Sequence, residues 1–321
     1  MITHSLIFDK EENAGLTVYL HEASPEYSRV SSRPFVLVIP GGGYSFCSER
    51  EAEPIALNFL AQGYQAGVLR YHVGENRSFE KSLADADRAL FEIHQHQNEW
   101  LIDKDKIAVI GFSAGGHLAA ALSNLGKIKP SLCILGYPAI LASFSKVMQI
   151  KAPSLESCVT KDTPPTFLFS TFEDNVVPIE NSLLYLRALE ENEVPFETHI
   201  FQKGRHGLSL ATKYFGNSSE IVDPRFGNWL KEVVEWMELN WQEKEPMILG
   251  EDLSTWPIKV LIQEEENKAV LFSIFPDWQE AGFYKIIKNF NLQQLAGLAP
   301  ERLTPEIITK LTTRFIKPKG E

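Results

Sequence analysis

The sequence has few cysteines, no excess of positive charge and no long apolar run, and each of these absences excludes a class of protein. Its 321 residues include three cysteines without a Cys-x-x-Cys pair, so neither a disulfide framework nor a cysteine-based zinc site is expected. The formal net charge is −11, which argues against nucleic acid and anionic membranes as partners, because both attract basic patches. No apolar run approaches the roughly 20 residues that a membrane-spanning helix requires.

Signals for secretion and for metal binding are also missing. The N-terminus lacks a basic segment followed by a long apolar stretch, so we expect a cytoplasmic protein. His94 and His96 are two residues apart and point in different directions on a helix, which does not suit a shared metal ion. His117 is expected to be a hydrogen-bonded core residue. We therefore predict neither a metal nor another cofactor.

What the sequence does contain is a Gly-x-Ser-x-Gly pentapeptide at residues 111–115. An apolar run at 106–110 precedes it and a helix-forming run at 116–122 follows it. A strand, a sharp turn and a helix are the context in which a serine is held on a strained turn as a nucleophile. The alternative is an ordinary turn, with glycines that permit tight packing and Ser113 capping the helix. The pattern predicts a serine hydrolase if a base and an acid accompany Ser113.

Two downstream loops could provide that base and that acid. Asp174 comes shortly after a predicted strand at 166–171, and His206 comes shortly after another at 196–201. The chain order is therefore Ser113, Asp174, His206. Because each residue follows the end of a strand, a parallel sheet would bring all three to one edge.

Each partner also has a simpler interpretation. Asp174 could be a helix cap or a solvated loop acid, and His206 could be an exposed turn residue. Glu173 is a weaker candidate for the acid. Asp223 ranks last because it follows His206 and would need a different chain order. The coincidence of all three residues at strand ends favours the catalytic interpretation.

A run of three glycines at 41–43 follows the predicted strand at 35–39. Consecutive glycines let the backbone approach a ligand closely, so we predict that Gly42 and Gly43 donate N–H groups to an oxyanion. The N–H of Ala114, the residue after the nucleophile, is the third predicted donor. A phosphate-binding loop is disfavoured because Gly-x-x-x-x-Gly-Lys-Ser/Thr is absent, and a flexible glycine turn is the remaining alternative.

Four motifs together resemble bacterial α/β-hydrolases of the acetyl esterase and lipase group, close to the acetylxylan esterase-like proteins. They are Pro-Gly-Gly-Gly-Tyr at 40–44, Gly-Phe-Ser-Ala-Gly-Gly-His-Leu at 111–118, Glu-Asp-x-Val-Val-Pro-x-Glu-Asn-Ser at 173–182 and Phe-x-Lys-Gly-x-His-Gly at 201–207. The resemblance covers residues 15–242. Pro40 stands where the hormone-sensitive-lipase branch has histidine, which argues against that branch.

The resemblance implies a carboxylic-ester hydrolase that acts on short-chain acyl esters, acetyl esters foremost and those of sugars among them. It implies an acyl-enzyme mechanism with Ser113 as nucleophile, His206 as base and Asp174 as orienting acid. The expected partner is a small-molecule ester, and a homodimer is possible. A prolyl-oligopeptidase-type serine peptidase is the alternative, although only about thirty residues precede Phe35 and such enzymes usually carry a large propeller there.

Alternating strands and helices predict an α/β class protein with a mostly parallel, doubly wound sheet of the α/β-hydrolase fold. We expect a catalytic domain at 1–242, in which the segment 141–162 forms a short cap over a small, open site. Candidate walls of the acyl pocket are Tyr44, Phe46, Phe112, Tyr137 and Val177.

After a charged, proline-ended linker at 243–246, we expect a small α+β module at 243–321. A β-hairpin formed by 258–262 and 269–275 would pack against helices at 279–289 and 305–315. Nothing in these residues selects among partner binding, dimerisation and covering the site. A hydrolase scaffold kept only for binding is disfavoured, because it would have no need for a complete set of catalytic elements.

Overall fold

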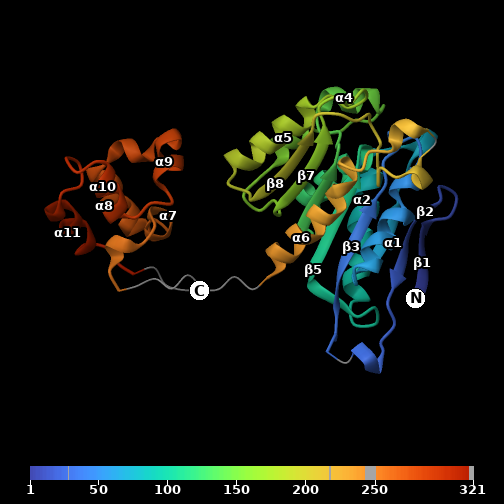
Figure 1. Ribbon diagram of the computed structural model, residues 1–321, viewed down its shortest axis with the longest axis horizontal. Helices are drawn as coiled ribbons and strands as arrows, with labels where there is room; N and C mark the ends of the chain where they lie inside the picture. The colour runs from blue at the N-terminus through green and yellow to red at the C-terminus, as the bar shows by residue number, and fades with distance from the viewer. Residues whose placement is uncertain (28, 217, 243–250, 318–321) are drawn as a thin grey trace. The chain divides into compact units, whose positions relative to one another are not determined.

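The computed structural model describes residues 1–27, 29–216, 218–242 and 251–317 (Figure 1). The chain divides into two compact units, residues 1–242 and residues 243–321. The linker predicted at 243–246 lies outside the described residues. In the described part of the chain, no helix is both long and apolar enough to cross a membrane.

An eight-stranded sheet forms the centre of the larger unit, with the strand order β1-β2-β4-β3-β5-β6-β7-β8. Strands β3 to β8 run parallel to one another, and β1 and β2 are antiparallel additions at one edge. The strands are β1 (Ile2–Asp9), β2 (Ala14–Leu20), β3 (Arg33–Ile39), β4 (Gln65–Arg70), β5 (Ile102–Phe112), β6 (Leu132–Gly136), β7 (Thr166–Thr171) and β8 (Phe196–Phe201). The predicted doubly wound, mostly parallel sheet is confirmed.

Helices cover both faces of this sheet (Figure 1). They are α1 (Glu53–Ala61), α2 (Phe79–Gln95), α3 (Ala114–Leu125), α4 (Ala142–Val147), α5 (Glu180–Glu191) and α6 (Trp229–Trp241). Helix α2 begins at a serine cap, because the side chain of Ser78 accepts a hydrogen bond from the N–H of Lys81.

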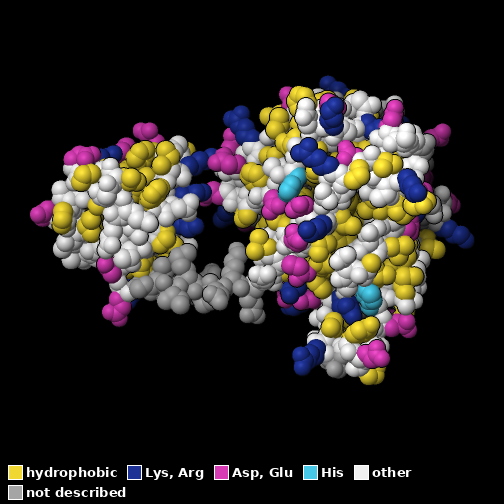
Figure 2. Space-filling model, viewed as in Figure 1, with side chains coloured by type: hydrophobic (Ala, Val, Ile, Leu, Met, Phe, Trp, Pro, Cys, Tyr) yellow, Lys and Arg dark blue, Asp and Glu magenta, His cyan; other side chains and the backbone are white. Residues whose placement is uncertain are grey.

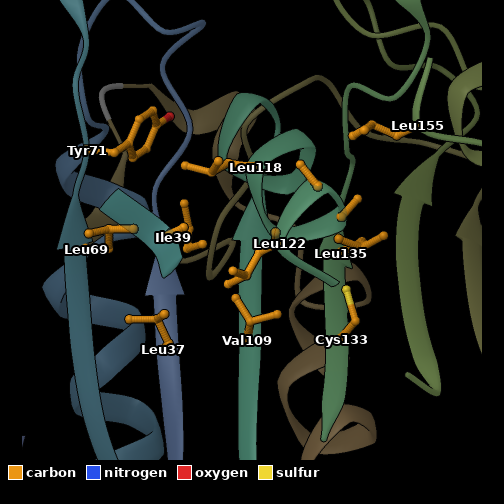
Figure 3. Packing of buried hydrophobic residues seen from close by; sticks show 14 of the residues in the cluster. Leu37, Ile39, Leu69, Tyr71, Val109, Leu118, Leu122, Cys133, Leu135 and Leu155 are labelled. Carbon is orange, nitrogen blue, oxygen red and sulfur yellow. The ribbon is translucent and has the colours of Figure 1, made fainter. Parts of the chain in front are cut away.

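Successive side chains of a strand point to opposite faces of the sheet, so the core consists of two layers, one on each face. In β3, Leu37 and Ile39 belong to the buried cluster that includes residues of α2, α3 and α5, whereas Val36 and Val38 belong to the cluster that includes residues of α1 and α6. Figure 3 shows the first layer, in which Leu118 of α3 lies among buried residues of the central strands. These strands are buried on both faces and consequently read as continuous apolar runs.

The smaller unit differs from the prediction, because the regular elements that the structure describes there are helical and the predicted β-hairpin is wrong. The helices are α7 (Ile258–Leu261), α8 (Glu265–Ile274), α9 (Ala281–Ile287), α10 (Leu292–Leu298) and α11 (Pro305–Thr312). The module is therefore not α+β in its described part. A short apolar run can be a strand or a buried helix, and the buried side chains of Asn267 and Leu271, four residues apart, fit the helical period.

The two units have separate hydrophobic cores. In the smaller one, Trp256, Leu271 and Trp278 are among the buried residues. The start of the helix predicted at 305–315 is confirmed, since the side chain of Thr304 caps α11 and Pro305 takes the first helical position. On the face shown in Figure 2, basic and acidic side chains of the described residues are interspersed, without a continuous basic patch.

Candidate active site

Ser113 lies at the junction between β5 and α3, on a backbone with φ of 52° and ψ of −116°. Two glycines make this sharp junction possible. A Cβ atom on Gly111 would collide with the carbonyl of Gly115, and one on Gly115 would collide with the carbonyl of Ile39. The serine side chain does not cap α3. The glycines thus permit close packing, while the hydroxyl of Ser113 is left for another partner.

That partner is His206, and Asp174 lies behind it. The Oγ atom of Ser113 is 2.8 Å from Nε2 of His206, and Nδ1 of His206 is 2.7 Å from Oδ2 of Asp174. With a neutral imidazole the serine hydroxyl donates to Nε2, and Nδ1–H donates to the carboxylate. The three residues predicted from the ends of separate strands therefore form one hydrogen-bonded chain.

The carboxylate of Asp174 is held from its other side by the backbone. Its Oδ1 atom accepts hydrogen bonds from the N–H groups of Val176, at 2.9 Å, and Val177, at 2.8 Å. The side chain is only 2 % exposed. Two backbone donors on Oδ1 direct Oδ2 toward His206, so the loop interpretation and the catalytic interpretation of Asp174 are compatible. The rival Glu173 is exposed.

The loop that carries His206 is anchored by three contacts. Asn175 accepts a hydrogen bond from the N–H of His206 through its Oδ1 atom, at 3.1 Å. The hydroxyl of Thr171, at the end of β7, donates to the carbonyl of Gly204 at 2.7 Å. The ring of Tyr137 meets the imidazole edge-on, with 5.0 Å between the ring centroids. These contacts fix the position and the plane of the imidazole ring.

The glycine loop after β3 lies beside Ser113. Gly42 and Gly43 have φ angles of 122° and 63°, in the left-handed region that glycine adopts most readily. Both residues line the same cavity as Ser113 and His206. Ala114 is the first residue of α3, so its N–H belongs to the turn whose donors have no acceptor within the helix. Two of the residues predicted to donate to an oxyanion therefore line the cavity of Ser113, and the third directly follows Ser113 in the chain.

The cavity above Ser113 has a volume of about 310 Å³. Part of its wall comes from the segment 141–162, where a cap was predicted. The apolar side chains around it are Phe46, Phe144, Val147, Met148 and Val176. Of these, Phe46, Val176 and Val147 are 59 %, 52 % and 67 % exposed, so the rim of the cavity is open and apolar.

Only Phe46, of the five pocket residues predicted from the sequence, is part of this wall. Tyr44, Phe112, Tyr137 and Val177 are buried and do not line the cavity, so these four predictions are corrected. Phe112 packs against Phe169 and Trp229 in the core. A residue that is close in sequence to a catalytic loop can still have its side chain in the core. The side chain of Val176 therefore lines the cavity, whereas that of Val177 is buried.

Sequence reasoning missed a buried carboxylate beside the glycine loop. Glu51 is 2 % exposed and lines the cavity. Its Oε2 atom accepts from the N–H of Gly41 at 2.9 Å, and its Oε1 atom accepts from the hydroxyl of Tyr137 at 2.7 Å. The available signal is the charged run at 49–53, which five residues separate from the glycine loop.

A hydrogen bond also joins Tyr44, the residue after the glycine loop, to α3. Oη of Tyr44 lies 2.9 Å from Nδ1 of His117, and His117 is fully buried. The interpretation of His117 as a hydrogen-bonded core residue is confirmed. Burial lowers the pKa of His117 to about 3, because desolvation penalises the charged imidazolium.

We expect this histidine to make the protein acid-sensitive. Between its ordinary pKa of 6.5 and about 3, only the unfolded state binds the proton, so the free energy of unfolding falls as the pH falls. From pH 7 to pH 5 the loss due to this residue is about 2 kcal/mol. Urea unfolding at both pH values measures it, with His117→Gln as the comparison. An equal loss in the variant would contradict this assignment.

Two families match different parts of the chain. The family described as BD-FAE matches residues 20–132, and the prolyl oligopeptidase family matches residues 143–234. Among curated proteins, endo-1,4-beta-xylanase B of Butyrivibrio fibrisolvens is 34% identical over 230 residues, which are 62% of this chain and 35% of that protein. The acetylxylan esterase of Xylanibacter ruminicola is 26% identical over 221 residues, 62% of this chain and 45% of that protein. The chain thus spans less than half the length of these two relatives.

Solved structures match nearly over their full length. MGS-M1, an alpha/beta hydrolase enzyme from a Medee basin deep-sea metagenome library, is 40% identical with a TM-score of 0.71, and the match covers 75% of this chain and 98% of that one. The acetyl ester-xyloside bifunctional hydrolase of Caldicellulosiruptor lactoaceticus is 33% identical with a TM-score of 0.63, covering 73% of this chain and 91% of that one.

Proposed function

The chain belongs to the α/β-hydrolase family, and we propose that it is a serine carboxylesterase that cleaves short-chain acyl esters through an acyl-enzyme. The observation that carries this proposal is the hydrogen-bonded chain Ser113–His206–Asp174 at the wall of an open cavity, beside a glycine loop. A nucleophile, a base and an orienting acid in this arrangement are the components that acyl transfer requires.

In the proposed mechanism Oγ of Ser113 attacks the ester carbonyl while Nε2 of His206 takes the hydroxyl proton. The tetrahedral intermediate carries its negative charge on the former carbonyl oxygen, where N–H groups of Gly42, Gly43 and Ala114 would stabilise it. Its collapse breaks the bond to the alcohol, which leaves with the proton from His206. A water molecule then repeats these steps on the acyl-enzyme, releasing the carboxylic acid and restoring the serine hydroxyl.

Acetyl esters are the proposed substrates, with an acetylated sugar as the proposed alcohol part. Two relatives support this choice by name, an acetylxylan esterase and an acetyl ester-xyloside bifunctional hydrolase. The cavity is open, and Ser45, Ser48 and Arg50 add polar groups to its lining, which suits an ester whose larger part extends into solvent. The expected partner is therefore a small molecule.

We expect p-nitrophenyl esters from acetate to octanoate to be cleaved with kcat/KM highest for acetate and declining with acyl length. The reason is that the cavity is open and its rim residues are more than half exposed, so the added methylenes of a longer acyl chain would stay partly in water and gain little from burial. Spectrophotometric release of p-nitrophenol measures each rate. A maximum at octanoate would contradict the short-chain assignment, and no cleavage of any ester would contradict the esterase proposal itself.

A peptidase of the prolyl oligopeptidase type is the competing function. The match to that family at 143–234 contains Asp174 and His206, which is the specific observation in its favour. The acetylxylan esterase and the acetyl ester-xyloside bifunctional hydrolase each match more of the chain than the model of that family does, and they support the esterase proposal over the peptidase. Cleavage of a proline p-nitroanilide faster than of p-nitrophenyl acetate would reverse this order.

A further inference from the structure

We propose that Glu51 is a positioning residue, whose buried carboxylate holds the glycine loop and the His206 loop in place relative to each other. The inference rests on the proposed serine esterase function. Glu51 is the last residue of a short 3₁₀ helix, Glu49–Glu51, that precedes α1, and it contacts neither the hydroxyl of Ser113 nor the imidazole of His206 through a hydrogen bond. Its influence on the reaction would pass through its two hydrogen-bond partners.

The first partner is the glycine loop. The N–H of Gly41 donates to Oε2 of Glu51 at 2.9 Å. Gly41 is also wedged between this carboxylate and the nucleophile, since a Cβ atom added to it would lie 2.6 Å from Oε2 and 3.0 Å from Cβ of Ser113. Gly42, a predicted oxyanion donor, is the next residue. The carboxylate therefore fixes the backbone immediately before the oxyanion donors, at its point of contact with Ser113.

The second partner is Tyr137, which leads to the base. Its hydroxyl donates to Oε1 of Glu51 at 2.7 Å, and its ring lies edge-on against the imidazole of His206. The same hydroxyl accepts a hydrogen bond from the N–H of Ser209 at 3.0 Å, three residues after His206. One tyrosine thus connects Glu51 both to the ring of the base and to the loop that carries it.

A parallel link reinforces this connection. The hydroxyl of Ser209 donates to the backbone carbonyl of Arg50 at 2.6 Å, and the indole N–H of Trp229 donates to the carbonyl of Ser209 at 2.8 Å. The side chain of Glu51, through Tyr137, and the backbone carbonyl of Arg50 therefore both connect to Ser209 in the loop after His206. Helix α6, which begins at Trp229, anchors that loop from the core.

The chemistry of the carboxylate explains why this position holds a glutamate. A buried charge destabilises a fold unless hydrogen bonds compensate it, and here each carboxylate oxygen has its own donor. Glutamine has nearly the same shape but presents one acceptor and one donor group. The N–H of Gly41 can only donate, so the glutamine oxygen would face Gly41 and its amide group would face the hydroxyl of Tyr137. Glu51→Gln therefore removes the acceptor of the Tyr137 hydroxyl proton without emptying the site.

We expect Glu51→Gln to lower kcat for p-nitrophenyl acetate by about 10- to 100-fold, because small displacements of catalytic groups have effects of this size. KM should change by less than about threefold, since the contact acts on the transition state rather than on substrate binding. The matched control is Glu53→Gln, two residues away. Glu53 pairs with Arg70 outside the cavity, and its variant should keep kcat within about twofold of the wild type.

A second variant keeps the test decisive if Glu51→Gln folds poorly, which thermal unfolding would reveal. Tyr137→Phe removes only the hydroxyl, leaves the ring against His206, and should lower kcat by about 10-fold. The double variant should lose little more than the worse single variant, because both changes break the same link. A purely structural role would give additive losses that follow the melting temperature.

Two outcomes overturn the proposal in different ways. If the wild type cleaves esters and the folded Glu51→Gln and Tyr137→Phe variants keep kcat within about twofold, the positioning role is wrong and the esterase function stands. If the wild type cleaves no ester and no serine-directed phosphonate labels Ser113, the function fails and this inference fails with it. A selective loss of kcat in both variants, absent in Glu53→Gln, supports the proposal.

Discussion

Replacing Ser113 with alanine is expected to lower kcat for p-nitrophenyl acetate by about 10⁴-fold or more. The substitution removes the oxygen that lies 2.8 Å from Nε2 of His206, while the glycine loop and the cavity stay in place. Without that oxygen no acyl-enzyme can form. The residual rate would come from binding and from the oxyanion donors acting on a water molecule. Release of p-nitrophenol over hours, corrected for spontaneous hydrolysis, is the measurement.

The control for this prediction is His206→Ala, alone and together with Ser113→Ala. Residues that act as one unit give losses that do not add, so the double variant should be about as slow as either single variant. Retention of more than about one hundredth of the wild-type kcat in Ser113→Ala would mean that water, activated by His206, attacks the ester directly. The serine would then not be the nucleophile.

The second large effect is expected for Asp174→Asn, with a loss in kcat of about 10³- to 10⁴-fold. The two backbone N–H groups that bind Oδ1 would keep the remaining oxygen of the asparagine on their side. Its amide group would then face Nδ1 of His206 as a donor. The imidazole would have to accept at Nδ1 and carry its proton on Nε2, where it could no longer accept the proton of Ser113.

Asp223→Asn is the matched control for this variant. Asp223 accepts hydrogen bonds from the N–H groups of Arg225 and Phe226, both at 3.0 Å, so its local geometry resembles that of Asp174. No hydrogen bond joins it to His206 among the described residues. Its variant should keep kcat within about twofold, and the exposed Glu173→Gln should do the same. A loss in either that matched Asp174→Asn would show that the acid is misassigned.

The positions that carry this site could be predicted because their signals are local. A glycine–serine turn between a strand and a helix, and polar residues just beyond two other strands, are visible within a few residues. The parallel arrangement of β5, β7 and β8 then brings Ser113, Asp174 and His206 to one edge. Neither step requires knowledge of distant side-chain packing.

The remaining features depend on contacts that no local pattern encodes. The role of Glu51 requires Tyr137, which is 86 residues away in the chain, and a charged residue after a loop usually lies in solvent. Closeness to a catalytic loop in sequence does not identify the residues of the pocket wall, because the side chains of neighbours such as Val176 and Val177 face opposite ways. The strand β1 lies at the edge of the sheet and all of its residues are exposed or half-buried, so its apolar pattern in the sequence is weak.

The left-handed backbone at Ser113 has a consequence for how such a sequence can change over time. A residue with a side chain is less stable there than glycine by roughly 1 kcal/mol, and the cause is the Cβ atom rather than the hydroxyl. Glycine would be the more stable residue at this turn but carries no nucleophile, so the local backbone and the proposed chemistry favour different residues at position 113.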